Sequence, residues 1–262
     1  MIDPVTALYV YCIVKAAAAP SMARVPPGLP GAGKPEAVKV SESLWLIGAR
    51  VPLDTYGGTA LERGLADLDW VGRIALAHEA VVEHFTAKRG STVVPMKLFT
   101  MFSNAERAVA EIAGRRVAID RTMRRIAGAE EWGVRVVRAV TAASEPSAKA
   151  TRAASGTAFL RARKQARDDA RFARAAAAEA AANAYERLQK LARDATRRQL
   201  DAPSGTVPPL LDAAFLVESK KRAAFARAAE REAEICARAG AQMTLSGPWP
   251  AYNFVQGSER TR

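Results

Sequence analysis

Apolar residues follow two different periods along this chain, and each period predicts a different kind of element. Short runs rich in β-branched and aromatic residues predict strands at residues 7–14, 38–51, 92–99, 132–140 and 210–217, and an extended segment at 242–255. Apolar residues spaced by three and four predict amphipathic helices at residues 65–88, 104–127 and 219–238. Strands and helices mixed in this order indicate an α+β fold.

Local residues refine two of these elements. Ser103 or Asn104 is a suitable N-cap for the helix that follows. Pro95 removes a backbone donor from the strand at residues 92–99, so we expect that strand to lie at a sheet edge or to bend.

The longest helical pattern covers residues 157–200 and contains no proline or glycine. Its apolar positions form a seam made largely of alanine: Phe159, Ala162, Ala166, Ala170, Ala173, Ala177, Ala180, Ala184, Leu188, Leu191 and Ala195. At about 1.5 Å per residue this helix would be roughly 65 Å long, which is more than a compact domain needs. We therefore expect a coiled-coil-like helical arm.

A chain of 262 residues is long enough for two domains. The small-residue segment at residues 141–156 predicts a linker between them. We expect an N-terminal α+β domain at residues 1–140 and a C-terminal α/β domain at residues 157–262 that carries the long helix.

The charge of the chain is strongly basic, with a formal net charge of +12 and an isoelectric point near 10.1. Much of it lies on the long helix, and the candidate partner-binding residues are Arg161, Arg163, Lys164, Arg167, Arg171 and Arg174. Nucleic acid, an anionic membrane or an acidic protein would each suit this charge, so charge alone does not choose among them. A solvated helix surface is an equally simple reading of it.

The two cysteines, Cys12 and Cys236, lie far apart in apolar stretches and form neither a redox pair nor a zinc motif. Buried thiols in a reducing compartment are the simpler interpretation. The apolar run near the N-terminus is too short for a signal or membrane segment, and we expect a soluble, cytoplasmic protein.

Residues 28–34 fit the first seven positions of a phosphate-binding P-loop. A P-loop needs Ser or Thr after the lysine and then a helix, whereas here Pro35 follows Lys34 and leads into a predicted strand. A P-loop-like nucleotide-binding protein is therefore only an alternative reading, and we expect no cofactor.

Both histidines, His78 and His84, lie six residues apart on one predicted helix, which does not match the four-residue spacing of zinc ligands. No activated nucleophile or dinucleotide fingerprint is present either. We therefore expect no catalytic residue, no metal site and no enzyme activity. A basic nucleic-acid-binding protein remains an alternative on charge, although the chain carries none of the common nucleic-acid-binding motifs.

Five segments together resemble the gas vesicle protein L/F family. They are LYVY at residues 8–11, AHEAVV at 77–82, VVPMKLFTMF at 93–102, EWGVRV at 131–136 and LSGPWPAYNFV at 245–255, and the last is the most specific. Cys12 and Phe99 stand where many members have glycine, so local packing in those strands is expected to differ.

The resemblance implies an accessory protein of gas vesicle formation that binds the small hydrophobic shell protein and other accessory proteins. It also implies a ferredoxin-like N-terminal α/β domain, and a C-terminal domain with a long coiled-coil helix. The expected location is the cytoplasm and the gas vesicle, with no small-molecule substrate and no membrane span.

The motif residues are expected to maintain the fold, with partner contact as the minority interpretation. They are Pro95, Trp132, Gly133, Gly247, Pro248, Trp249 and Pro250. In particular, Gly247 to Pro250 should form a stiff bend that anchors the chain end, with the Trp249 ring buried.

Overall fold

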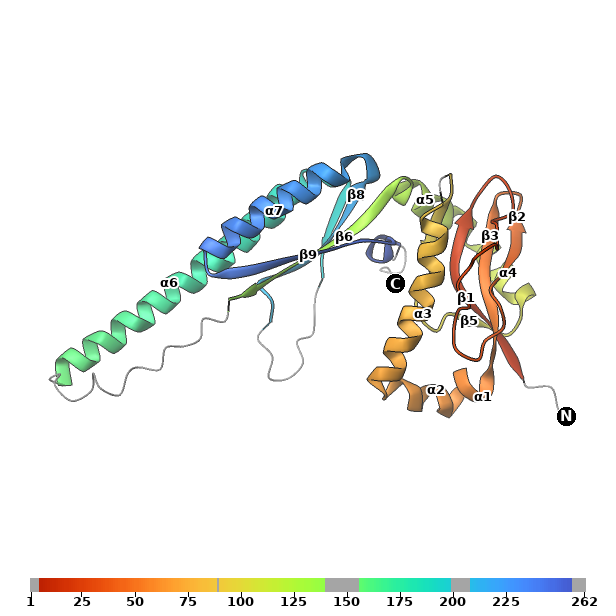
Figure 1. Cartoon of the computed structure of the whole chain (residues 1–262), viewed down its shortest axis with the longest axis horizontal. Helices are drawn as coiled ribbons and strands as arrows, with labels where there is room; N and C mark the ends of the chain where they lie inside the picture. Colours follow the sequence, from red (N-terminus) through yellow and green to blue (C-terminus); the bar gives the residue numbers. More distant parts are fainter. Residues whose placement is uncertain (1–4, 89, 140–155, 199–207, 256–262) are drawn as a thin grey trace. The chain divides into compact units, whose positions relative to one another are not determined.

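The computed structural model describes residues 5–88, 90–139, 156–198 and 208–255, and it divides into two compact units (Figure 1). The first unit comprises Met1–Glu130 and Trp249–Arg262, and the second comprises Glu131–Pro248. The expected linker lies outside the described residues except at its last position, residue 156.

The first unit contains a five-stranded sheet in the order β2-β3-β1-β4, with β5 also paired to β1. Its strands are β1 (Thr6–Lys15), β2 (Glu36–Ser41), β3 (Leu44–Pro52), β4 (Thr92–Pro95) and β5 (Met101–Phe102). The predicted strand at residues 38–51 is thus a hairpin of two strands. β1 is buried along almost its whole length because helices cover both faces of the sheet (Figure 1).

Helices pack on the two faces of this sheet. The helices α1 (Leu53–Tyr56), α2 (Gly58–Leu65) and α3 (Leu68–Thr86) precede β4, and α3 contributes Ile74, Val81 and Phe85 to the core beneath it. The helices α4 (Ala105–Gly114) and α5 (Arg116–Ile126) lie on the opposite face, and the short helix η3 (Tyr252–Phe254) completes the unit. Asn104 caps α4 by accepting a 2.8 Å hydrogen bond from the Arg107 amide.

The helix expected at residues 104–127 is divided into α4 and α5. Arg115 has a φ of −97° and a ψ of 12°, which interrupts the helical backbone directly after Gly114. Glycine is a weak helix former, so it favours a break at this position.

The second unit contains a four-stranded sheet in the order β7-β8-β6-β9. Its strands are β6 (Ala129–Arg138), β7 (Asp194–Arg197), β8 (Leu211–Glu218) and β9 (Ala241–Trp249). The helices α6 (Gly156–Gln189) and α7 (Arg222–Arg238) cover one face, and η2 (Ser219–Lys221) precedes α7. Figure 1 shows α7 lying along the C-terminal half of α6.

The ferredoxin-like layout expected for the first domain is not confirmed. That layout places a helix between its first two strands, whereas β1 and β2 are joined by a segment rich in proline and glycine, and β1 pairs antiparallel with β3. The β-α-β-β-α-β order occurs in the second unit instead, as β6-α6-β7-β8-α7-β9.

The compact units also divide the chain at different residues from the expected domains. β6, which was expected in the first domain, forms part of the second unit's sheet, where the Leu210 amide donates to the Val136 carbonyl at 2.8 Å. The segment Trp249–Arg262, which was expected in the second domain, belongs to the first unit. Hydrogen-bonding partners distant in sequence determine both assignments.

The helix α6 ends at Gln189 instead of near residue 200, because Asp194–Arg197 pairs with β8 as β7. Residues 177–188 of its seam pack in the core, while residues 157–176 carry mostly exposed side chains. A coiled-coil arm is therefore not confirmed within the described ranges. None of the described helices combines the length and apolar character needed to cross a bilayer.

Candidate functional site

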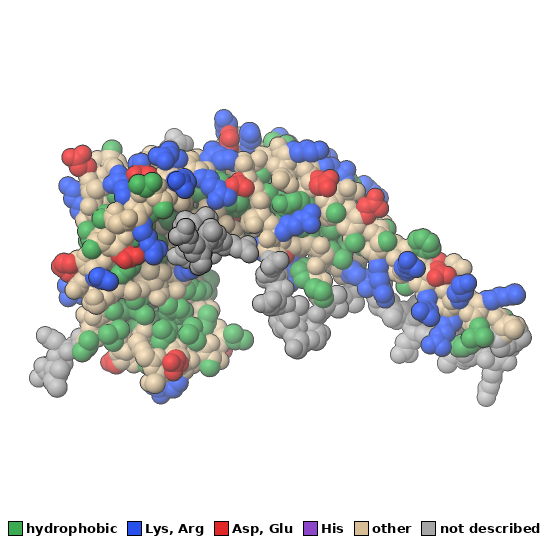
Figure 2. Space-filling model, turned by 180° about the vertical axis from the view of Figure 1, so that it is seen from behind, with side chains coloured by type: hydrophobic (Ala, Val, Ile, Leu, Met, Phe, Trp, Pro, Cys, Tyr) green, Lys and Arg blue, Asp and Glu red, His purple; other side chains and the backbone are tan. Residues whose placement is uncertain are grey.

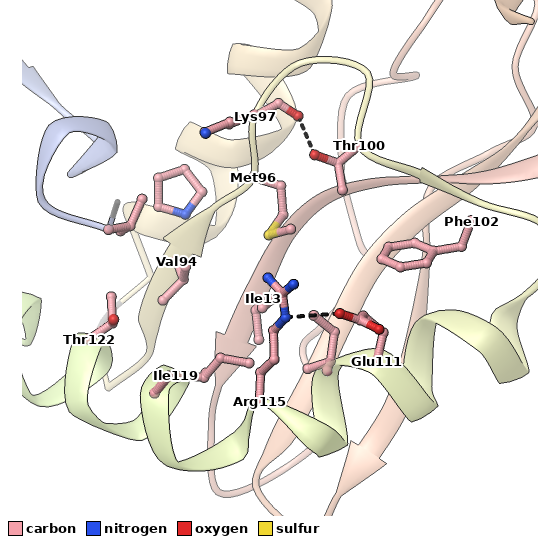
Figure 3. Close-up of a pocket in the computed structure, with 14 residues that line it drawn as sticks. Ile13, Val94, Met96, Lys97, Thr100, Phe102, Glu111, Arg115, Ile119 and Thr122 are labelled. Atoms are coloured by element: carbon pink, nitrogen blue, oxygen red, sulfur yellow. Dashed lines mark hydrogen bonds and ion pairs between the residues drawn. The ribbon is translucent and has the colours of Figure 1, made fainter. Parts of the chain in front are cut away.

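The first unit has a cavity of about 380 Å³ between its sheet and the helices α4 and α5 (Figure 3). Its walls are mainly apolar and include Ile13 from β1, Val94 from β4, Ile119 from α5 and Val255 from the chain end. An Arg115–Glu111 ion pair of 2.9 Å lies at the helical side, as Figure 3 shows. The cavity can accept an apolar side chain, and its rim offers charged groups.

A tight turn after β4 forms part of this cavity wall. The Thr100 hydroxyl and amide both donate to the Lys97 carbonyl, at 2.8 and 3.2 Å. Phe99 within the turn has a φ of 61°, which lies in the left-handed region that glycine adopts freely. Its ring stacks on Trp70 at a centroid distance of 5.7 Å, so packing accompanies this backbone conformation.

The positions of Cys12 and Pro95 are also related. Cys12 is buried at an irregularity in the pairing of β1 with β3, and burial raises the pKa of its thiol. Pro95 pairs with Cys12 at the end of β4, which is the last strand of the main sheet path. An edge position suits a residue that lacks a backbone donor.

A polar network fills the core beneath α3. The Phe99 amide donates to Tyr9 Oη at 3.4 Å, and Tyr9 Oη lies 2.7 Å from His78 Nδ1. Burial lowers the pKa of His78 to about 4 and raises the pKa of Tyr9, so both side chains are neutral at pH 7. The hydroxyl and the imidazole therefore share a hydrogen bond between neutral groups, and this contact holds α3 on β1.

The P-loop-like segment is part of the same core. The Leu29 amide donates to Tyr11 Oη at 3.1 Å, and the Gly33 amide donates to the Arg50 carbonyl at 2.8 Å. A side chain on Gly28, which has a φ of 80°, would collide with Tyr11 Oη. Amides that would hold a phosphate are already used by the protein, and a strand follows instead of a helix.

The two histidines of α3 lie in different environments. His78 is buried, whereas His84 is only partly buried and contacts the Phe85 ring. Within the described ranges no group of three or more His, Cys, Asp or Glu residues could hold a metal ion.

The EWGVRV segment lies within β6 in the second unit. The Trp132 ring is buried and lies 6.1 Å from the Phe225 ring, which is on α7. The next residue, Gly133, faces the opposite side of the sheet, where an added Cβ would lie 2.6 Å from Ser246 Oγ. Trp132 thus packs in the core, and Gly133 allows close approach on the outer face.

The C-terminal motif is arranged differently from the expected Trp249 anchor. Trp249 is 42% exposed. Pro250 and Phe254 are buried instead, and the Tyr252 hydroxyl donates a 2.6 Å hydrogen bond to Glu79 Oε2. Gly247 has a φ of 117°, and its peptide bond to Pro248 is cis.

The six candidate partner-binding residues all lie on the exposed first half of α6. None of them forms an ion pair within the described part of the chain, and Phe172 nearby is 73% exposed. Figure 2 shows Lys and Arg side chains along this helix. The structure therefore places them together on an accessible surface.

Sequence reasoning missed two contacts between residues distant in the chain. One is the Tyr252–Glu79 hydrogen bond, and the other is the Arg198–Asp212 ion pair on the outer face of the second sheet. Asp212 interrupts the otherwise apolar run of β8, which is a signal for a buried charge that needs a partner. No sequence signal identified Arg198 as that partner.

Comparisons with known proteins agree over nearly the full length. A curated relative from a Streptomyces species, "Gas vesicle protein L", is 31% identical over 261 residues, covering 94% of this chain and 92% of the relative. Crystal structures of the gas vesicle protein GvpF share the fold. The Anabaena protein has a TM-score of 0.67 at 15% identity, with 98% of this chain and 99% of that chain covered. The Microcystis aeruginosa protein has a TM-score of 0.62 at 14% identity, with 95% and 99% covered.

A family model also matches most of the chain. That family is described as "Gas vesicle synthesis protein GvpL/GvpF", and the match covers residues 7–256. The chain therefore belongs to the GvpL/GvpF family of gas vesicle synthesis proteins.

Proposed function

We propose that this chain binds the small hydrophobic shell protein and other accessory proteins during gas vesicle formation. Family membership supports a gas vesicle accessory role. The observation that carries the proposal is the exposed first half of α6, which presents six cations and an apolar seam. Binding, and not catalysis, is the activity we assign to it.

The seam of α6 is already used for helix packing in its second half. Ala177, Ala180 and Ala184 are buried in the core that α7 and the sheet share. Small side chains let two helix backbones approach closely. The same seam continues through Ala166, Ala170 and Ala173, whose side chains are exposed, so a partner helix could pack there in the same manner.

The charge of this region indicates the chemistry of its partner. Six cations outnumber the acidic residues Asp168 and Asp169 between positions 157 and 176. An acidic helix of the shell protein or an accessory protein would complement this charge. Charge would accelerate the encounter, and apolar packing along the seam would hold the complex.

The cavity of the first unit supplies a second surface that suits the shell protein. Its mainly apolar walls can enclose an apolar side chain, and a volume of about 380 Å³ is in the range of ligand pockets. Thr122 lines this cavity from α5. A Thr122→Phe variant should fill the cavity and reduce shell-protein capture if the surface is used.

The test of the helix surface is a charge reversal of Arg163, Arg167, Arg171 and Arg174 to glutamate in the full chain. Capture of purified shell protein and of purified accessory proteins is measured across a salt series. The control reverses two exposed arginines on α7, Arg227 and Arg231. We expect the fourfold variant to lose capture, because the reversal turns a net positive surface at residues 157–176 into a net negative one that repels an acidic partner. The control should retain capture that weakens with salt, because salt screens exposed charges.

Duplex DNA as a competitor distinguishes the alternative reading. Unchanged capture with an unchanged salt slope in the fourfold variant would show that the helix is only a solvated surface. Efficient displacement of the partner by DNA would instead favour a nucleic-acid-binding role for these cations.

A further inference from the structure

The outer face of the second unit's sheet carries a polar cleft of about 390 Å³. All four strands or their immediate ends contribute to it. Its lining residues are Gly133 and Arg135 from β6, Arg198 directly after β7, Asp212 from β8, and Thr244 and Ser246 from β9. The core of the unit lies on the other side of the sheet, so this cleft opens away from α6 and α7.

Asp212 orients the cations of this cleft. Its side chain is 5% exposed, and its Oδ1 accepts a 2.5 Å hydrogen bond from Arg198 Nε. The Arg198 amide also donates to the Asp212 carbonyl at 2.8 Å, which fixes the backbone of both residues. Because Nε is engaged, the two outer nitrogens of the Arg198 guanidinium are available for another acceptor. Arg135 Nη1 lies 3.7 Å from Asp212 Oδ2 and is held more loosely.

Donors converge in the space above Gly133. A Cβ built on Gly133 would lie 2.6 Å from Ser246 Oγ and 3.3 Å from Arg198 Nη2. A side chain at this position would fill the space, and glycine leaves it open. No hydrogen bond to the Ser246 or Thr244 hydroxyl occurs within the described residues. Ser246 Oγ and Arg198 Nη2 therefore lie beside the same open space.

We propose that this cleft binds a carboxylate group, held by Arg198, Arg135 and the hydroxyls of Ser246 and Thr244. The two guanidinium groups and the one carboxylate of Asp212 leave a net charge of +1, which one carboxylate neutralises. A phosphate, with a charge of about −1.5 to −2 at pH 7, would leave excess negative charge beside the buried Asp212. The planar guanidinium also matches the two oxygens of a carboxylate.

A metal cation is a poorer fit to the same cleft. Among the described residues that line it, Asp212 supplies the one carboxylate, which already accepts from Arg198, and the other charged groups are cations. The carboxylate could come from an acidic side chain of a partner protein or from a free small acid, and the chemistry of recognition is shared. This proposal goes beyond the proposed function and does not depend on it.

The experiment titrates isotopically labelled full-length chain and follows the backbone amide resonances of Gly133, Thr244 and Ser246. The probes are sodium acetate, a blocked tripeptide with a central glutamate, and inorganic phosphate, at ionic strength matched with chloride. The glutamine version of the tripeptide is the control probe. We expect saturable shifts with acetate or the glutamate peptide, and weaker binding of phosphate.

Variants test whether the named groups are responsible. Arg198→Gln should weaken carboxylate binding about tenfold or more, because it removes a charged donor. Ser246→Ala keeps the Arg198–Asp212 pair intact and should also weaken binding, which keeps the test valid if Arg198→Gln fails to fold. Arg197→Gln is the matched control, since Arg197 lies 4.4 Å from the Tyr185 ring centroid and is not among the cleft residues.

The possible results separate clearly. Binding of the glutamate peptide identifies a partner side chain as a source that fits, and binding of acetate alone identifies a free small acid. The proposal is overturned if no saturable shift occurs, if the glutamine peptide or phosphate binds as well as the carboxylates, or if Arg198→Gln and Ser246→Ala both bind like the parent.

Discussion

The Tyr252 hydroxyl donates a 2.6 Å hydrogen bond to Glu79 Oε2, which joins the end of the chain to α3. Burial raises the pKa of Tyr252, and the hydrogen bond to Glu79 raises it further. Phe254 two residues later is 1% exposed and lies 5.7 Å beneath the Arg125 guanidinium. The C-terminal motif is therefore anchored by Tyr252 and Phe254.

Truncation of Phe254 tests this anchor. Phe254→Ala should lower the free energy of unfolding by about 3–5 kcal/mol, as the removal of a large buried ring does. Trp249→Ala, a matched aromatic truncation at an exposed position, should cost much less. Urea unfolding of both variants measures the difference, and equal losses would contradict the assignment.

The buried His78 predicts a dependence of stability on pH. Its pKa is about 4 in the folded chain and about 6.5 when unfolded, so the unfolded chain binds more protons between these values. The contribution of His78 to stability is therefore present above pH 6.5 and is lost as the pH falls toward 4. The maximum loss is about 3 kcal/mol.

The measurement is the free energy of unfolding between pH 4 and pH 7 for the parent and for His78→Gln. The glutamine variant should show a flatter profile across this window, because it cannot gain the proton. His84→Gln is the control, since His84 is less buried. A parallel profile for the parent and His78→Gln would assign the acid sensitivity to other groups.

The P-loop-like segment should not bind nucleotide. A ligand that binds the folded state raises its melting temperature. Because we expect no binding, ATP or GTP with Mg²⁺ should leave the melting temperature unchanged. Lys34→Ala should likewise leave stability close to that of the parent. A dose-dependent rise in melting temperature that Lys34→Ala abolishes would restore the nucleotide-binding interpretation.

An ion pair fixes α6 against α7 in the second unit. Arg187 Nε lies 3.0 Å from Glu232 Oε1, and the Glu232 side chain is only 9% exposed. Arg187→Met should destabilise the chain by about 1–3 kcal/mol, since it leaves a buried carboxylate without its partner. The Arg187→Met and Glu232→Leu double variant should recover much of this loss, and exposed Arg231→Met is the control. If the double variant loses as much free energy of unfolding as the two single variants together, the pairing is contradicted.

The existence and type of most elements could be predicted from the sequence, because the spacing of apolar residues within a short segment indicates a helix or a strand. The three-and-four spacing predicted α3 and α7, and the β-branched run at residues 7–14 predicted β1. Pro35 after Lys34 argued against a P-loop, and the positions of the backbone hydrogen bonds agree. The family could also be identified, since its motifs are local strings of residues.

Only the tertiary structure decided which elements associate. β6 follows the helices of the first unit in sequence but pairs in the sheet of the second, and the chain end returns to the first unit through Tyr252. Strand pairing and hydroxyl–carboxylate contacts join residues far apart in the chain, so no local period encodes them. The motif around Trp249 therefore suggested a buried ring, although the ring is partly exposed in the structure. Arg198, Asp212 and Gly133 likewise lie far apart in the sequence and line one cleft only because four strands lie side by side.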